Sequence, residues 1–135
     1  MQVTRAQIFR RGMTHRCPNC GEATLFPPGK FFELNPGCAH CGYRFDTDEG
    51  GFLGALALNY GVTAFVIVVP TIVVAYSFEQ SGATIAGLAL SAALLAPILL
   101  YRASRSWWLM CDALFSPEEL PHNREVSGQP HAPPV

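Results

Sequence analysis

The chain has 135 residues, a net charge of −1, and 50% hydrophobic against 14% charged side chains. This length allows one small domain plus an addition, and the apolar excess suggests that the addition is a membrane segment. Residues 1–50 carry six basic and five acidic groups. This balance excludes the strongly basic surface that a phosphate backbone requires, so we expect no nucleic-acid partner.

The segment from Thr4 to Arg11 predicts a short helix, with Thr4 as its N-cap and Gly12 as its stop. Ile8 falls on one side of this helix and arginines on the other, a pattern that suits a helix lying along a membrane surface. Because so short a helix is marginal by itself, a disordered basic leader is the alternative.

Two Cys-x-x-Cys pairs, each followed by glycine, are separated by the seventeen residues 21–37. This spacing is typical of a four-thiolate metal site. A chain that wraps two sulfurs around one ion must turn sharply, and a glycine after each pair permits the turn without a Cβ clash. The predicted metal ligands are Cys17, Cys20, Cys38 and Cys41.

Disulfides and a redox pair are the other interpretations of these cysteines. A thioredoxin-type motif needs a single pair inside a βαβ pattern, which this sequence lacks, and disulfides need an oxidising compartment. Four thiolates suit zinc or a single iron ion. The run from Cys41 to Phe45 resembles a rubredoxin knuckle, but rubredoxins place that knuckle first and use a longer separation. We expect zinc, with iron as the alternative.

Between the cysteine pairs, residues 24–26 and 30–34 have the composition of strands, and proline–glycine turns follow each of them. Residues 1–50 are therefore predicted to form a small, metal-stabilised β head of the zinc-ribbon kind. So few residues bury little core, so the metal has to contribute folding free energy. His40, between Cys38 and Cys41, is either a solvent-facing residue or an auxiliary ligand.

Two stretches without charged side chains predict an α-helical transmembrane hairpin over residues 51–101, with helices at about 52–78 and 83–101. Each is long enough to cross a bilayer, which takes about 20 apolar residues. Asn59 lies inside the first helix, where its amide needs a partner. Because Pro97 cannot donate a helical hydrogen bond to the carbonyl of Ala93, we expect Asn59 to bond that oxygen in a structural role. Ligand or lipid binding is the alternative role for Asn59.

After the second helix, basic and amphipathic aromatic residues predict a membrane anchor at the bilayer surface. Residues 102–120 are expected to continue as an interfacial amphipathic helix, and residues 121–135, rich in proline without periodicity, as a disordered tail. Cys111 is expected to serve packing alone. The anchor residues are Arg102, Arg105, Trp107 and Trp108.

The basic residues also predict the topology of the hairpin. Six of the nine Lys and Arg precede the first apolar stretch, three follow the second, and none lies in the connection at 79–82. The positive-inside rule then places both termini in the cytoplasm. Cytosolic thiols stay reduced, which favours a metal over disulfides.

These features together resemble the bacterial membrane proteins catalogued as domain of unknown function 983. The likeness rests on the two Cys-x-x-Cys-Gly knuckles, the turn at residues 34–36, the run of residues 51–55 leading to Asn59-Tyr60-Gly61, and the hairpin. It covers about residues 10–115. The resemblance implies a bacterial inner-membrane location. Genes of this family often lie near those of cytochrome c oxidase, which implies a link to respiratory-complex assembly.

We therefore expect a non-enzymatic membrane protein that acts as a scaffold or assembly factor for a membrane complex. A four-cysteine site leaves zinc no open position for a catalytic water. The alternative function is a metal or thiol-redox carrier that delivers to a membrane client. Expected partners are the lipid bilayer and either another membrane protein or a second copy of the chain.

Overall fold

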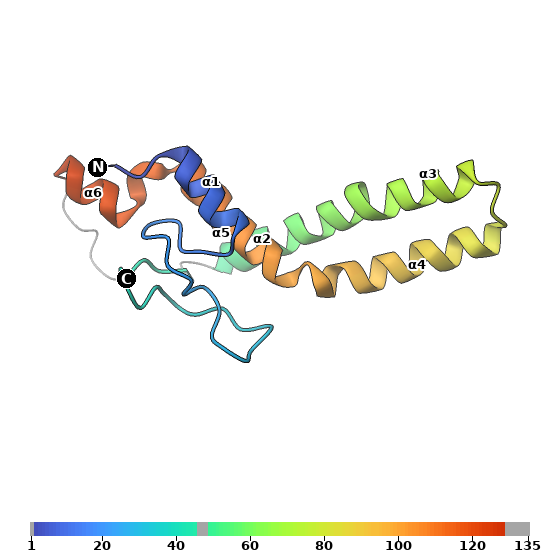
Figure 1. Ribbon diagram of the computed structural model, residues 1–135, viewed down its shortest axis with the longest axis horizontal. Coiled ribbons are helices and arrows are strands. Elements are labelled where there is room, and N and C mark those ends of the chain that lie inside the picture. The colour runs from blue at the N-terminus through green and yellow to red at the C-terminus, as the bar shows by residue number, and fades with distance from the viewer. Residues whose placement is uncertain (1, 46–48, 129–135) are drawn as a thin grey trace.

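A computed structural model describes residues 2–45 and 49–128, with the side chain of Glu49 excepted. The molecule is elongated, with a head at one end and two long helices that extend from it side by side (Figure 1). The remaining parts of the predicted head and tail, residues 1, 46–48 and 129–135, lie outside the described residues.

The two long rods form the predicted hairpin. The first rod comprises α2 (Glu49–Val62), η1 (Thr63–Val68) and α3 (Val69–Ser77), and the second is α4 (Gly82–Leu99). Within them, Gly51–Ser77 and Gly82–Leu99 are long and apolar enough to cross a membrane. These bounds agree with the predicted helices to within two residues, because the apolar stretches end where charged or turn-forming residues begin.

The middle of the first rod, η1, is a π-helical segment, in which the N–H of Val69 bonds the carbonyl of Ala64, five residues back. Pro70 follows directly and lacks the N–H that an α-helix would use to bond Val66. The missing donor explains why the helix changes its hydrogen-bond register at this point.

Helix α5 (Tyr101–Phe115) joins the hairpin to the head, because it packs against both α1 (Arg5–Met13) and α2. Glycines allow both close approaches, because a Cβ on Gly12 would clash with the side chain of Met110 and one on Gly54 would clash with the Trp108 ring. The hydroxyl of Ser106 donates a hydrogen bond of 2.7 Å to the carbonyl of Gly12. Helix α5 is thus enclosed by protein along two faces.

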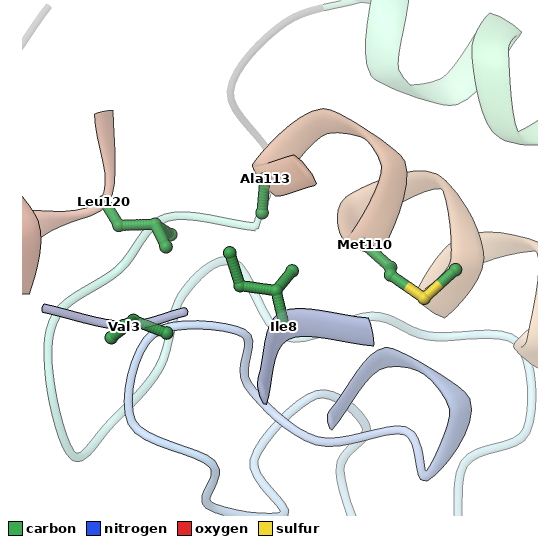
Figure 2. Close-up of a cluster of buried hydrophobic side chains, with 5 residues drawn as sticks. All are labelled: Val3, Ile8, Met110, Ala113 and Leu120. Atoms are coloured by element: carbon green, nitrogen blue, oxygen red, sulfur yellow. The ribbon is translucent and has the colours of Figure 1, made fainter. Parts of the chain in front are cut away.

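A small core lies where α1 meets α5 and the C-terminal segment. Ile8 is fully buried and points toward α5, as Figure 2 shows, while Val3 lies beside Leu120. The predicted cap of α1 is confirmed: Thr4 and Gln7 exchange side-chain hydrogen bonds with each other's backbone N–H. The members of this cluster are Val3, Ile8, Met110, Ala113 and Leu120.

The C-terminal part differs from the prediction of one interfacial helix and a disordered tail. Helix α5 ends at Phe115, and η2 (Pro117–Glu119) and α6 (Pro121–Ser127) follow. Asn123 explains the added order, since its buried amide accepts from the N–H of Val3 (2.6 Å) and donates to the carbonyl of Pro117 (2.8 Å). These long-range bonds cannot be recognised from local composition.

The head contains no strand among the residues described, so the expected β-ribbon is replaced by loops. One isolated antiparallel bridge pairs Gly37 with Arg44. The segments expected to be strands, 24–26 and 30–34, consist of bends and irregular loop. Pro27 and Pro28 lie between them and have no N–H to donate to a ladder.

Candidate metal centre

Each cysteine pair forms the same tight turn. The N–H of Gly21 donates to the carbonyl of Cys17 at 2.8 Å, and the N–H of Gly42 donates to the carbonyl of Cys38 at 2.9 Å. Both glycines have left-handed backbones, with φ of 86° and 72°. A residue with a Cβ would be strained there, so the glycines explain how each turn brings two sulfurs to one side.

The two turns bring the four predicted ligands together. The sulfurs of Cys17, Cys20, Cys38 and Cys41 all lie within 4.8 Å of one another, and all four cysteines are free. Two of the sulfur–sulfur separations are 3.7 Å, for Cys17 and Cys41, and 3.5 Å, for Cys20 and Cys38. A tetrahedron with zinc–sulfur bonds of about 2.3 Å has edges of about 3.8 Å. The donor set and its spacing therefore fit one thiolate-bound metal ion.

The surroundings favour ionisation at one sulfur and oppose it at two others. Burial raises the pKa of the Cys38 thiol, but hydrogen bonds from Thr24 and from the backbone at Cys41 and His40 outweigh it and lower the pKa to about 6. Burial raises the pKa of Cys17, and it raises that of Cys20 to about 11. A metal cation would supply the positive charge that lets the remaining thiols ionise.

The first turn is held in place by helices at both ends of the chain. The guanidinium of Arg11, on α1, donates to the carbonyls of Pro18 (2.9 Å) and Asn19 (2.7 Å). The side chain of Asn19 is buried and accepts from the N–H of His122 on α6 at 3.1 Å. The metal centre is therefore tied to α1, which packs on α5, and to α6.

The second turn is held by the loop that precedes it. The hydroxyl of Thr24 donates to the sulfur of Cys38 at 3.0 Å. Asn35 keeps Thr24 in place, since its amide donates to the Thr24 carbonyl at 2.7 Å. Beneath them, Leu25 and Phe45 are buried against Cys17 and Cys38. This arrangement orients one ligand sulfur and covers the inner side of the cluster.

The outer side of the cluster opens into a pocket of about 660 Å³. Cys20 and Cys41, which are partly exposed, contribute to its wall, whereas Cys17 and Cys38 are buried. His40 lines this pocket as an exposed residue, and among the described residues the ligand cluster comprises the four cysteines alone. Other lining residues are Gln7, Arg11, Asn19 and His122.

Asn59 is buried where α2 faces α4, and its amide donates to the carbonyl of Pro97 at 2.9 Å. The expected partner was the carbonyl of Ala93, so the acceptor lies one turn further along α4. Pro97 is among the last four residues of α4, whose carbonyls have no partner within their own helix. The helix end, rather than the ring of the proline, explains the acceptor that Asn59 uses.

The predicted anchor residues pack partly inside the protein. The Trp108 ring lies against Gly54, and Trp107 packs on the Ile8 core. The guanidinium carbons of Arg102 and Arg105 lie over the rings of Phe26 (4.4 Å) and Phe52 (4.8 Å). Cys111 is partly buried against the same core as Trp107. Membrane anchoring by this group stays a prediction.

Sequence reasoning missed the residues that support the metal ligands. Thr24 was expected in a strand and Arg11 at a membrane surface, and no role was predicted for Asn19. The signal for Asn35 was visible as an Asn-Pro-Gly turn, but nothing local indicated that its side chain holds Thr24. Such contacts depend on which loops meet in three dimensions.

The fold and the site together define a class of protein: a predominantly helical chain with two candidate membrane-spanning helices and a four-cysteine head that can hold a metal ion. The family model described as "Protein of unknown function (DUF983)" matches residues 29–112, and the chain belongs to this family. The matched part includes the second cysteine pair, both rods of the hairpin and most of α5. The chain has no match among curated proteins or among solved structures.

Proposed function

We propose that this protein is a non-enzymatic scaffold or assembly factor for a membrane complex, of which a respiratory complex is one example. In this proposal the hairpin spans the bacterial cytoplasmic membrane, with both termini in the cytoplasm. The head carries one structural zinc ion, bound by Cys17, Cys20, Cys38 and Cys41 in the manner of a zinc ribbon. The carrying observation is the compact cluster of four sulfurs, since four ligands complete the coordination of zinc and leave no place for a reacting water.

Two glycines on the surface of the hairpin support the proposal of a partner within the membrane. Gly61 and Gly87 have open space where a Cβ would project, so neither is used for packing inside this chain. Small residues allow helix backbones to approach closely in membranes. Another membrane protein, or a second copy of this chain, is the partner that such positions suit.

The scaffold proposal is tested by replacing each of the four cysteines by serine. Because structural zinc binding and folding are coupled, every replacement should unfold the head and lower the amount of protein and of the partner complex alike. His40→Ala is the matched control and should leave both unchanged. Elemental analysis should find one zinc per chain. Iron in place of zinc would contradict the choice of metal. A partner complex that keeps its normal amount although the head is unfolded would contradict the scaffold function.

A metal or thiol-redox carrier is the second candidate, favoured by the pocket beside Cys20 and Cys41. A carrier must release its metal or expose a reactive thiol, and these two partly exposed sulfurs are the accessible ones. The serine variants separate the two functions. A Cys20→Ser or Cys41→Ser protein that stays folded but no longer supports its client would favour the carrier over the scaffold.

A further inference from the structure

Aromatic and basic side chains from three separate segments gather where the hairpin meets the head. Phe31 and Phe32 come from the loop between the cysteine pairs, and Phe32 contacts Tyr101 at the start of α5 with ring centroids 5.2 Å apart. Arg102 lies 5.7 Å from the Phe31 ring, and Arg105 lies 4.8 Å from the Phe52 ring. We call this set the Arg–Phe patch: Phe31, Phe32, Phe52, Arg102 and Arg105.

The positive charge of the patch has no acidic partner within the part of the chain that is described. The neighbouring salt bridge joins Lys30 to Glu33 at 2.6 Å and leaves both arginines out. The Nε atoms of Arg102 and Arg105 are buried without a hydrogen-bond partner. Aromatic faces attract a guanidinium but do not neutralise its charge. Both side chains are partly exposed, so an anion would complete them at the accessible part of each guanidinium.

The patch lies at the depth of lipid headgroups if the hairpin spans a bilayer. Arg102 and Arg105 follow Leu99, the end of the second span, by three and six residues. At a rise of about 1.5 Å per residue they lie about 5 and 9 Å beyond the span. The headgroup region on each side of a bilayer is about 5–8 Å thick, so the Cα of Arg102 lies within it and that of Arg105 at its outer edge. Phe52 is the second residue of the first span, at the boundary of the apolar layer, and the Arg105 guanidinium reaches back over its ring.

The aromatic rings of the patch face outward although they are apolar. The exposed fractions are 42% for Phe31, 58% for Phe32 and 45% for Phe52. At a bilayer surface such rings would be covered by acyl chains, while the adjacent guanidiniums would meet phosphate. An apolar surface beside two cations that have no acidic partner among the described residues therefore matches an anionic phospholipid in both of its parts.

We propose that the Arg–Phe patch binds an anionic phospholipid, with the phosphate at Arg102 and Arg105 and the acyl chains against Phe31, Phe32 and Phe52. The lipid holds the loop at residues 27–33 on the bilayer and fixes the orientation of the metal head above the membrane. This inference rests on the hairpin spanning the bilayer but not on any client protein.

Photo-crosslinking tests which partner meets the loop. The full chain is expressed in its membrane with Phe32→p-benzoylphenylalanine, irradiated and analysed by mass spectrometry. A phospholipid adduct is expected. The positive control is Phe65→p-benzoylphenylalanine, which should also give a phospholipid adduct, because Phe65 is 77% exposed in the middle of the span. Phe115, at the far end of α5, is the negative control and should give none. A protein adduct at Phe32, or no adduct while Phe65 reacts, would overturn the proposal. Failure at Phe65 would instead contradict the membrane insertion.

A second experiment tests the two arginines. The full chain is reconstituted in nanodiscs of phosphatidylcholine with or without phosphatidylglycerol, and retained lipid is counted by native mass spectrometry. Arg102→Gln and Arg105→Gln should each weaken phosphatidylglycerol retention about fivefold. A matched control, Arg5→Gln with Arg10→Gln, removes two exposed charges of α1. An equal loss of phosphatidylglycerol retention in the control would mean that the lipid is held by unspecific charge attraction, and it would overturn the proposed lipid site. Metal content reports whether each variant stays folded, and the crosslink at Phe32 does not depend on these variants.

Discussion

At the scale of single residues, glycines decide where helices touch. Gly54 lies under the Trp108 ring, whereas Gly61, two turns further on, faces open space. Gly54→Ala should therefore destabilise the protein by about 1–3 kcal/mol through overpacking. Gly61→Ala is the control and should be neutral or stabilising, because alanine is the better helix former by about 1 kcal/mol. Titration with a denaturing detergent, followed by circular dichroism, measures both. Equal effects at the two positions would contradict the packing of α2 on α5.

Asn59 provides a second test at this scale. Its hydrogen bond to Pro97 joins the two rods, whereas the hydroxyl of Thr71 bonds the carbonyl of Ile67 within its own rod at 2.6 Å. Asn59→Leu should cost about 0.5–1.5 kcal/mol of hairpin stability, the usual value of a polar contact between membrane helices. Thr71→Val is the control and should cost less. A variant Asn59→Leu that keeps its stability but loses function would show that Asn59 binds a ligand instead.

At the scale of elements, the side chain of Asn123 ties α6 to the N-terminal segment and to η2. The Asn123 side chain bonds the backbone of Val3 in both directions, at 2.6 Å and 3.3 Å, and the carbonyl of Pro117. Asn123→Ala would leave the buried N–H of Val3 unpaired, at a cost of about 1–3 kcal/mol.

The expected result for Asn123→Ala is release of both chain ends, seen as faster trypsin cleavage at Arg5 and Arg124. Ser127→Ala is a suitable control, because the hydroxyl of Ser127 bonds only the carbonyl of Asn123 in the same helix. Cleavage that is unchanged by the loss of Asn123 would mean that packing of Leu120 holds α6 without these bonds.

At the scale of the whole molecule, the head and the hairpin should differ in their dependence on metal. Chelation should unfold the turns around Gly21 and Gly42, since structural metal binding is part of folding, and leave both rods helical. Hydrogen exchange should rise at those amides and stay slow in residues 51–77 and 82–99. A head that keeps its protection after the metal is removed would contradict the structural role.

The same argument predicts how metal binding depends on pH. All four sulfurs must be thiolates to bind, while burial raises the pKa values of Cys17 and Cys20 above the usual range. Protons therefore compete with the metal, and the metal should be retained at neutral pH and lost as the pH falls toward about 5. Metal content after dialysis at a series of pH values measures this. Retention that is independent of pH would contradict thiolate ligation.

The orientation of the molecule in the membrane is tested by thiol labelling in a Cys111→Ser background. Because the basic residues flank the hairpin, Ser81→Cys should react with an impermeant reagent added outside intact cells. Ser127→Cys should react only after the cells are permeabilised. Labelling at Ser127→Cys from outside would place the head on the opposite side.

Local chemistry in the sequence is sufficient to predict the cysteine turns, the two rods and the start of α1. The spacing of two Cys-x-x-Cys-Gly turns predicts the sulfur cluster, because each turn is closed by bonds within a few residues. The lengths of the two apolar stretches predict helices at about 52–78 and 83–101, close to the observed 51–77 and 82–99, because a helix satisfies its own backbone. Thr4 predicts the start of α1, because the hydrogen bonds of its cap join residues only three apart in the chain, Thr4 and Gln7.

Only the tertiary structure decides how these parts are joined. The sequence pattern suggested a ribbon of strands, but the described loops form one isolated bridge, and contacts with α1 and α6 hold the first cysteine turn instead. Nothing near Arg11 in the sequence reveals its bonds to Pro18 and Asn19, and nothing near Trp108 reveals Gly54. The parts follow from interactions between neighbours in the chain. Their arrangement follows from which surfaces fit together, a property that local pattern does not contain.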